Sequence, residues 1–296
     1  MSDTPSHGPS RTTTIALIAL LCLIWGSTWV VIRDGLTDLP PFTAAAARFV
    51  VAAIGMAIVA KALGARETGK SPPARLWIAL GLCNFACSYA IVYRTETILP
   101  SALVALLWGV FPMLSAIAGH MFLPSERLRL THWAGFTLGF GGLALLFAKD
   151  LPQLGPEAVP AAAVLLLSPT VSTVGNTLVK RSGGGVRSLE LNRNAMAFGA
   201  VLLCALAFTT EDVASVAWTP RAILTVTYLS LVGTVLTFGL YFWLMRYVRA
   251  NTMSLISYVT PMVAMLLGVL YGETLTVWTA AGAACILGGV ALAVRK

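Results

Sequence analysis

Charged side chains are scarce in this sequence. Asp, Glu, Lys and Arg make up 11% of its 296 residues, whereas soluble domains carry roughly 25%. Hydrophobic residues make up 57%, and no water-soluble fold could cover that much apolar surface. The apolar runs are about 20 residues long, the length that a helix needs to cross roughly 30 Å of hydrocarbon. The composition therefore predicts an all-α membrane protein with several spans.

Acidic residues are absent from the interior of the predicted spans, and His120 and His132 flank a loop. A carrier coupled to protons or sodium usually needs an ionisable group within the membrane. We therefore expect uncoupled export driven by the substrate gradient. The same absence argues against a polyvalent cation as substrate and favours a neutral or zwitterionic solute with an apolar part.

Catalytic and metal-binding patterns are also missing. The sequence has neither an embedded Ser/His pair nor a His-Glu-x-x-His run, which argues against an intramembrane enzyme. Cys83 and Cys87 lie one helical turn apart, but two thiols without a nearby His or carboxylate make an incomplete metal site. We expect no metal and no cofactor. The net charge of +8 comes from scattered basic residues without an aromatic platform, which argues against nucleic-acid binding.

What the sequence has is a series of apolar runs joined by short connections rich in Pro and Gly. The first run follows a polar leader and lacks a cleavage site, so it is predicted to be an uncleaved span. The ten predicted spans are Thr14–Ile32, Phe42–Leu63, Leu76–Tyr93, Ala102–Phe122, Trp133–Ala148, Val159–Val179, Asn192–Thr209, Ala222–Tyr247, Thr252–Tyr271 and Val277–Val294. No connection leaves room for a soluble domain.

The second half of the chain repeats the first. Pro112 falls on Pro261 after a shift of 149 positions, and Glu126 falls on Glu273 after a shift of 147. We therefore divide the chain into two five-helix repeats, 1–149 and 150–296. Because each repeat has an odd number of spans, the second must enter the membrane upside down, and such inverted repeats are the geometric basis of alternating access.

The basic residues predict the orientation. With a cytoplasmic N-terminus, fourteen of the basic residues at the ends of the spans lie inside and four lie outside. This bias follows the positive-inside rule, so both termini are predicted to be cytoplasmic. The four outer ones are Arg33, Arg94, Lys149 and Arg221.

Several motifs resemble one family. They are Trp25-Gly26-Ser27-Thr28-Trp29, Arg48 in the second span, Ser101-Ala102-Leu103 followed by Pro112, and Glu126 with its repeat Glu273. In their order and recurrence they resemble the EamA-type drug/metabolite transporters. The resemblance implies ten helices in two inverted repeats and an exporter of small metabolites, often amino acids, in the bacterial inner membrane. Aromatic amino-acid exporters of the YddG type are a reasonable neighbour, and other amino-acid or multidrug exporters are the alternative.

Arg48 is the charged residue that lies furthest inside a predicted span. Its guanidinium either holds a substrate carboxylate bidentately or gates a cavity, or it is structural, bonding helix-end carbonyls or pairing with Asp34 or Asp38. We favour the structural interpretation. In the first span, Trp25 and Trp29 share a face and either stack on a flat substrate or, for Trp29, belong to the interfacial belt.

Other polar and aromatic residues within the spans complete the candidate substrate site. Ser168, Ser172 and Asn176 form one stripe on the sixth span, which needs either a substrate or a neighbouring helix to bond. The candidate lining comprises Trp25, Ser27, Thr28, Arg48, Asn84, Tyr89, Trp108, Phe111, Ser168, Ser172, Asn176, Tyr241 and Tyr258.

Prolines and glycines within the spans are expected to shape the bundle. Pro112 and Pro261 are repeat-related, so we expect matched kinks in the fourth and ninth spans, serving either as hinges or as static bends. The glycines of the fifth and tenth spans are expected to pack those helices closely. A channel would more naturally line its pore with rings from an oligomer, whereas the internal duplication makes a monomer sufficient for transport.

Overall fold

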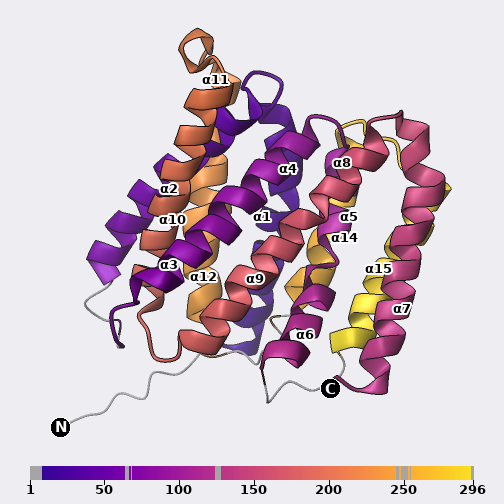
Figure 1. The fold of residues 1–296 in the computed structure, drawn as a ribbon, viewed down its shortest axis with the longest axis horizontal. Helices are drawn as coiled ribbons and strands as arrows, with labels where there is room; N and C mark the ends of the chain where they lie inside the picture. The colour runs from indigo at the N-terminus through magenta and orange to yellow at the C-terminus, as the bar shows by residue number, and fades with distance from the viewer. Residues whose placement is uncertain are drawn as a thin grey trace.

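The computed structural model describes residues 9–63, 67, 69–123, 128–244, 247, 253 and 255–294. Within these ranges the long regular elements are all helices, which confirms the all-α class (Figure 1). Extended backbone pairs there only in an isolated parallel bridge between Lys70 and Val186. Eight helices are long and apolar enough to cross a membrane.

The helices of the first half follow one another with short connections. They are α1 (Arg11–Gly35), α2 (Pro41–Leu63), α3 (Ala74–Leu80), η2 (Gly81–Cys87), α4 (Ser88–Glu96), α5 (Ser101–Trp108), α6 (Phe111–Phe122), α7 (Leu130–Leu145), η3 (Leu146–Asp150) and η4 (Leu151–Leu154). Those of the second half are α8 (Ala158–Leu165), α9 (Leu167–Ser182), α10 (Ser188–Thr210), η5 (Val213–Ser215), α11 (Pro220–Thr227), η6 (Tyr228–Leu236), α12 (Thr237–Leu244), α14 (Leu255–Leu270) and α15 (Val277–Val294).

The first eight predicted spans coincide with the eight long helices. The ninth and tenth coincide with α14 and α15, whose apolar stretches Val259–Leu270 and Val277–Leu292 are shorter. The count of ten spans therefore stays a prediction. The third span continues to Glu96, three residues beyond its predicted end at Tyr93.

Two spans are interrupted just before a proline. Helix α5 ends at Trp108 and α6 begins at Phe111, so the break precedes Pro112. Helices α8 and α9 meet at Leu166, shortly before Pro169. A proline lacks the N–H that would bond the carbonyl four residues earlier, and its ring clashes with that carbonyl. The breaks are therefore local consequences of sequence.

The two repeat-related prolines differ in their surroundings. A break between α5 and α6 precedes Pro112, whereas α14 runs through Pro261 without interruption, and the matched kinks stay a prediction. The ring of Pro261 lies beside Gly109, where an added Cβ would come within 3.5 Å of the Pro261 Cγ. The break between α5 and α6 thus lies beside α14, which is itself continuous. The hinge role of both prolines stays a prediction.

Two π-helical segments occupy the middle of the third and eighth spans. They are η2 and η6, and Tyr228 at the start of η6 stands 147 positions after Gly81 at the start of η2. π-helical turns often occur at functional sites because they widen the helix and shift the side chains that follow.

Helices far apart in the sequence pair across the molecule: α7 with α15, α2 with α10, α1 with α14, and α6 with α9. Figure 1 shows α7 and α15 side by side at one edge. A Cβ added at Gly142 would lie 2.8 Å from the Cys285 Cβ, and one added at Gly289 would lie 2.6 Å from the Gly139 nitrogen. The close packing expected of these glycines is confirmed at Gly142 and Gly289 but not at Gly141, where an added Cβ would meet nothing within 4 Å.

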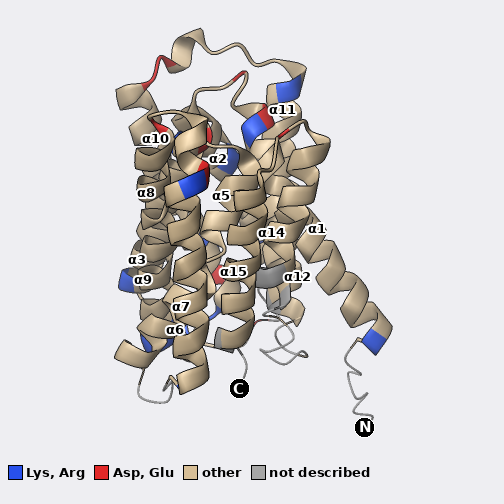
Figure 2. Ribbon diagram, turned by 90° about the vertical axis from the view of Figure 1, so that its right-hand side faces the viewer, with Lys and Arg blue, Asp and Glu red and all other residues tan. Residues whose placement is uncertain are grey.

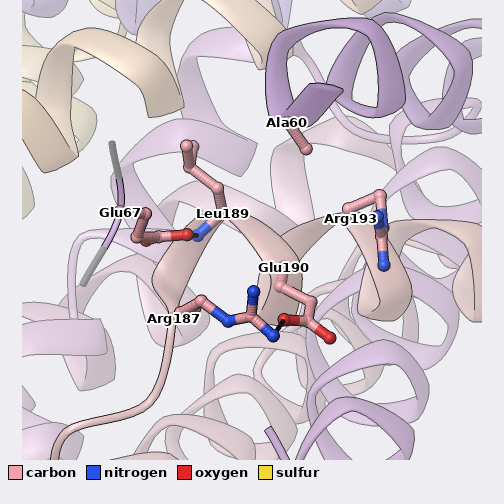
Figure 3. A pocket seen from close by; sticks show the side chains of 6 residues that line it. All are labelled: Ala60, Glu67, Arg187, Leu189, Glu190 and Arg193. Carbon is pink, nitrogen blue, oxygen red and sulfur yellow. Dashed lines mark hydrogen bonds and ion pairs between the residues drawn. The ribbon is translucent and has the colours of Figure 1, made fainter. Parts of the chain in front are cut away.

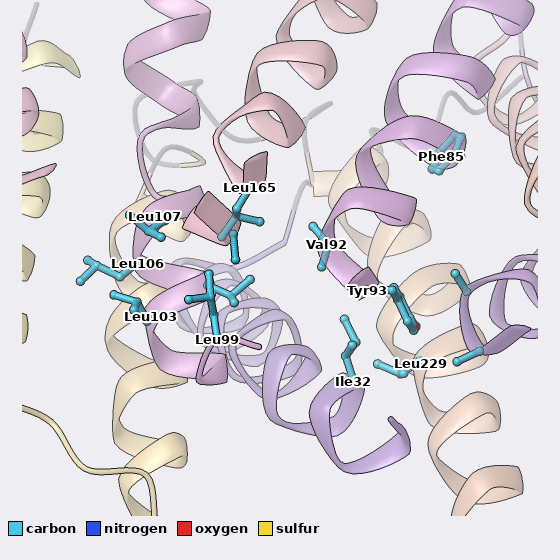
Figure 4. Packing of buried hydrophobic residues seen from close by; sticks show 14 of the residues in the cluster. Ile32, Phe85, Val92, Tyr93, Leu99, Leu103, Leu106, Leu107, Leu165 and Leu229 are labelled. Atoms are coloured by element: carbon cyan, nitrogen blue, oxygen red, sulfur yellow. The ribbon is translucent and has the colours of Figure 1, made fainter. Parts of the chain in front are cut away.

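The largest buried hydrophobic cluster draws on nearly all of the spans, from Ile32 of α1 to Val290 of α15. Figure 4 shows part of it: leucines of α5, among them Leu103 and Leu107, face Leu165 of α8, while Tyr93 of α4 lies near Leu229 of η6. All of these side chains are almost fully buried. Where they meet, the bundle is therefore closed by apolar packing.

Acidic residues gather at one end of the bundle, where α10 ends and α11 begins (Figure 2). We call it the acidic end; it carries Asp34, Asp38, Glu96, Asp150, Glu157, Glu211, Asp212 and Glu273. The opposite, basic end carries Lys61, Lys70, Arg75, Arg129, Lys180, Arg181, Arg187 and Arg193. The acidic end is the one that the sequence predicts to lie outside the cell.

Candidate functional site

Aromatic rings line the contact between the first and fourth spans. The rings of Trp108 and Phe111 stack, with centroids 4.9 Å apart, and Trp29 lies 6.2 Å from Trp108. All three side chains are only partly buried. A partly open row of flat rings can accept the apolar, planar part of a solute.

Trp25 belongs to a second aromatic group nearer the basic end. Its ring lies 5.5 Å from that of Tyr241 and 6.0 Å from that of Phe238. Trp25 and Trp29, which were expected to share a face of the first span, thus contact different ring partners. The structure brings Trp25 and Tyr241 together and places Trp29 with Trp108.

Ser27 and Thr28, the two hydroxyl residues in the middle of the first span, differ in their hydrogen-bond partners. Ser27 Oγ lies 2.7 Å from the Tyr228 hydroxyl of η6 and bonds the Ile24 carbonyl of its own helix. Thr28 also bonds its own helix, through the Trp25 carbonyl, and is buried with its methyl group against Gly233. Ser27 can therefore meet a solute by exchanging its Tyr228 bond, whereas Thr28 packs the first span on the eighth.

A buried hydrogen-bonded cluster supports the aromatic row. The Trp108 indole Nε1 donates to Ser168 Oγ at 2.9 Å, and Ser168 Oγ lies 2.8 Å from Ser88 Oγ. Ser168 is completely buried. The cluster therefore fixes the orientation of the Trp108 ring.

The predicted polar stripe on α9 bonds the third span. Asn84 Nδ2 donates to Asn176 Oδ1 at 3.0 Å, and Gly175 leaves the space that the Asn84 side chain occupies. Ser172 is buried on the same helix. Two of the three stripe residues, Ser168 and Asn176, thus have interhelical partners, which is the structural alternative given above.

Arg48 is 2% exposed and does not pair with Asp34 or Asp38. Its Nε and Nη2 donate to Thr234 Oγ1 at 3.3 and 3.2 Å, and its guanidinium carbon lies 4.8 Å from the centroid of Tyr89. Asp38 is engaged by Arg221 instead. Arg48 Nη1 has no hydrogen-bond partner among the described residues. Arg48 therefore joins the two halves of the chain and keeps one donor group, Nη1, without a partner among the described residues.

Tyr89 packs edge-on against Phe49 at 4.6 Å, so it joins Arg48 in one cluster. Tyr258 lies on α14, and its side chain is outside the described part of the chain. The sequence did not predict Tyr228, Thr234 or Ser88. Ser88 follows Asn84 by four residues on the third span and could have been found from that spacing, whereas Thr234 gave no local signal.

The third span ends later than the sequence predicts. It was expected to end at Tyr93, but Glu96 is the last residue of α4 and is completely buried. Glu96 stands at the end of its span, so the expectation that no acidic residue lies deep in a span is not contradicted. Export without ion coupling stays a prediction.

A surface pocket lies at the basic end between α2 and α10. Its volume is about 220 Å³, and it is lined by Ala60, Glu67, Arg187, Leu189, Glu190 and Arg193. Figure 3 shows Glu67 directed at the backbone nitrogen of Leu189, and Arg187 paired with Glu190. Most of these charges are engaged with one another, so we do not place the solute here.

The spans thus form a helical bundle in which aromatic and hydroxyl side chains line the contacts between neighbouring helices. A model of the EamA-like transporter family matches residues 12–148 and again residues 159–295. The chain belongs to the EamA-like transporter family. It is thus a multi-span membrane transporter of the drug/metabolite superfamily, which implies a small-molecule substrate and a lipid bilayer around it.

Two bacterial proteins named as transporters are similar to nearly the whole chain. YedA of Escherichia coli K12, an uncharacterized inner membrane transporter, is 29% identical over 90% of this chain and 86% of its own length. YoaV of Bacillus subtilis, an uncharacterized transporter, is 23% identical over 92% and 94%. A crystal structure aligns with a TM-score of 0.69 and 22% identity over 96% of this chain and 97% of its own. That structure supports the fold.

Proposed function

We propose that this EamA-like transporter exports amino acids with aromatic or large neutral side chains by alternating access between two inverted five-helix repeats. The observation that carries the substrate class is the partly open row of Trp29, Trp108 and Phe111, with the Ser27–Tyr228 hydroxyl pair beside the first span. The rings suit a planar apolar side chain, and the hydroxyls suit the polar part of a zwitterion.

Alternating access is supported by features that recur in the two halves. The π-helical segments η2 and η6 occupy corresponding positions. The contact of α1 with α14 has a counterpart in that of α9 with α6, in which each first span of a repeat meets the fourth span of the other. The same family model matches both halves. Exchange of such equivalent contacts is what allows inverted repeats to open alternately at the two ends.

The location that we propose is the bacterial inner membrane, with both termini in the cytoplasm. YedA is named as an inner membrane transporter, and the basic end of the bundle carries both the start of α1 and the end of α15. In this orientation the acidic end faces outward, in agreement with the positive-inside rule.

The test is counterflow in proteoliposomes preloaded with unlabelled phenylalanine. We expect accumulation of labelled phenylalanine, competition by other aromatic or large neutral amino acids, and no loss when a transmembrane pH gradient is collapsed. Competition by lipophilic drugs but by no amino acid would assign the multidrug function instead. Flux that does not saturate would indicate a channel.

A matched pair of variants localises the site. Trp108→Leu removes the ring that joins Trp29 to Phe111, and we expect counterflow to fall at least about tenfold, since stacked aromatic contacts contribute roughly 1–3 kcal/mol in binding sites. Trp133→Leu removes an indole that is 52% exposed on α7 and should leave counterflow unchanged. Equal effects of the two changes would argue against the aromatic row as the site.

A further inference from the structure

Glu96 occupies an unusual position at the acidic end. It ends α4, its side chain is 0% exposed, and neither carboxylate oxygen accepts a hydrogen bond from any described residue. The nearby Arg33 donates through Nη1 to the backbone carbonyls of Glu96 and Leu99, at 2.9 and 2.6 Å, and leaves the carboxylate itself without a donor. Glu96 is thus a buried acid whose backbone is held and whose side chain is not.

Burying an ionised carboxylate without hydrogen bonds is so costly that the group neutralises instead. The end of a helix adds to this cost, because the exposed carbonyls there carry partial negative charge. A protonated carboxyl at Glu96 avoids both penalties. The closed geometry of the acidic end therefore favours the form that carries a proton.

The charged groups around Glu96 come from three other elements. Arg33 of α1, Arg48 of α2 and Glu273 of the turn between α14 and α15 all interact with it electrostatically. Glu273 is well satisfied, since it accepts bonds from Ser101 N, Ser101 Oγ and Ala102 N at 2.7 to 2.9 Å. The Glu273 carboxylate therefore has hydrogen-bond donors, whereas that of Glu96 has none among the described residues, and a second carboxylate nearby disfavours a negative charge on Glu96.

Glu96 lies beside a cavity at the acidic end. The cavity has a volume of about 180 Å³ and is lined by Arg33, Leu36, Thr37, Glu96 and Thr97. Because the Glu96 side chain is 0% exposed, a movement of α4 away from α1 would be needed to open the carboxyl to this cavity.

We propose that Glu96 is a proton-binding site of the transport cycle: it holds a proton while the acidic end is closed and releases it to the solution at that end when α1, α4 and α5 separate. The proton enters and leaves from the same side, so it sets the balance between closed and open forms without being carried across. Raising the pH at the acidic end then favours the open form.

The proposal is tested by the accessibility of a buried position next to Glu96. Leu99 is 0% exposed. In a background in which the five native cysteines are replaced, Leu99→Cys is labelled with a membrane-impermeant maleimide in nanodiscs between about pH 5 and pH 9, the range in which buried carboxyls titrate. Gln153→Cys, exposed at the same end, corrects for the pH dependence of the thiol itself.

We expect the labelling of Leu99→Cys relative to Gln153→Cys to rise at least about fivefold with pH, a change of roughly 1 kcal/mol in the closing equilibrium. Addition of Glu96→Gln, which mimics the protonated acid, should keep the ratio low at every pH. A ratio that does not change with pH, or that changes equally in the Glu96→Gln background, would overturn the proposal. The assay involves no solute, so it is independent of the substrate assignment.

Infrared spectroscopy gives a second measurement that does not depend on the labelling variants. The carbonyl stretch of a protonated carboxylic acid should be present at about neutral pH, where exposed carboxyls are ionised, and should be missing after Glu96→Gln. Presence of the same band in the variant would show that Glu96 is not the protonated group.

Discussion

Glu211 accepts two hydrogen bonds from Thr43, one from its backbone N–H and one from its hydroxyl, both at 2.7 Å. Glu211 follows α10, and Thr43 lies in the first turn of α2. At the other end of the same helix pair, Glu67 follows α2 and accepts a bond of 2.9 Å from the Leu189 nitrogen in the first turn of α10. Each helix is thus capped by an acid that follows its partner.

Removing the charge of Glu211 should weaken this helix pair. Glu211→Gln keeps an acceptor but loses the charge that favours a helix N-terminus, so we expect a loss of about 1–2 kcal/mol in the free energy of unfolding. The measurement is thermal unfolding of the purified protein in detergent. Glu157→Gln serves as the control, because this exposed N-cap residue of α8 makes no cap hydrogen bond, and it should lower the midpoint less than Glu211→Gln does.

Glu273 forms the corresponding cap on α5 and should act as a latch on the acidic end. Glu273→Gln weakens its three bonds to Ser101 and Ala102. We expect the labelling of Leu99→Cys to increase roughly tenfold at fixed pH, as a loss of about 1.4 kcal/mol from the closed form implies. Unchanged labelling would show that the apolar packing around Leu99 closes this end without the latch.

The packing of α7 on α15 makes adjacent glycines differ. A Cβ at Gly142 would meet Cys285 and the Gly282 carbonyl at 2.8 Å, whereas one at Gly141 would have nothing within 4 Å. Gly142→Ala should therefore destabilise the protein by about 1–3 kcal/mol. Gly141→Ala should be neutral or slightly stabilising, because Ala favours a helix more than Gly does. Thermal unfolding of the two variants makes the comparison.

The helical layout could be predicted from the sequence because the bilayer leaves few alternatives. A segment of about 20 apolar residues must be a helix there, since its backbone can satisfy its hydrogen bonds in no other local way. The end of the third span was harder to place, because Arg94 and Glu96 look like loop residues. Only the packing of Arg33 onto the carbonyls of Glu96 and Leu99 keeps this segment in the bundle.

The sequence predicted which types of residue line the candidate site but only part of how they are arranged. The polar stripe of α9 follows from helical spacing, and its meeting with a polar neighbour was foreseen. Which neighbour it meets depends on helix pairing, so Asn176 with Asn84 became visible only in the structure. Arg48 stood out as a charge within a span, but Thr234 lies 186 positions away and carries no local pattern.

At the acidic end, Arg221 holds Asp38 through two hydrogen bonds, at 2.8 and 2.9 Å. These bonds and one from Thr219 lower the pKa of Asp38 from 3.8 to about 2. The stabilisation is therefore complete above the ordinary value and is lost as the pH falls toward about 2. The difference in unfolding midpoint between the wild type and Asp38→Asn should be constant from neutral pH to about pH 4. A difference that already declines between pH 7 and 5 would contradict this.

Substitution of Arg48 is expected to change transport and stability in different ways. The Arg48 guanidinium is buried and donates to Thr234, and Nη1 is unpartnered among the described residues. Replacing a buried charged group by an apolar side chain of similar size is often neutral or stabilising. Arg48→Met should therefore keep or raise the unfolding midpoint, while counterflow falls at least about tenfold because the Nη1 donor is lost. Arg48→Lys keeps the charge but not the planar fork and should also transport poorly. If Arg48→Met instead lowers the free energy of unfolding by about 2 kcal/mol or more, Arg48 stabilises the bundle through its contacts with Thr234 and Tyr89. That outcome would support the structural interpretation.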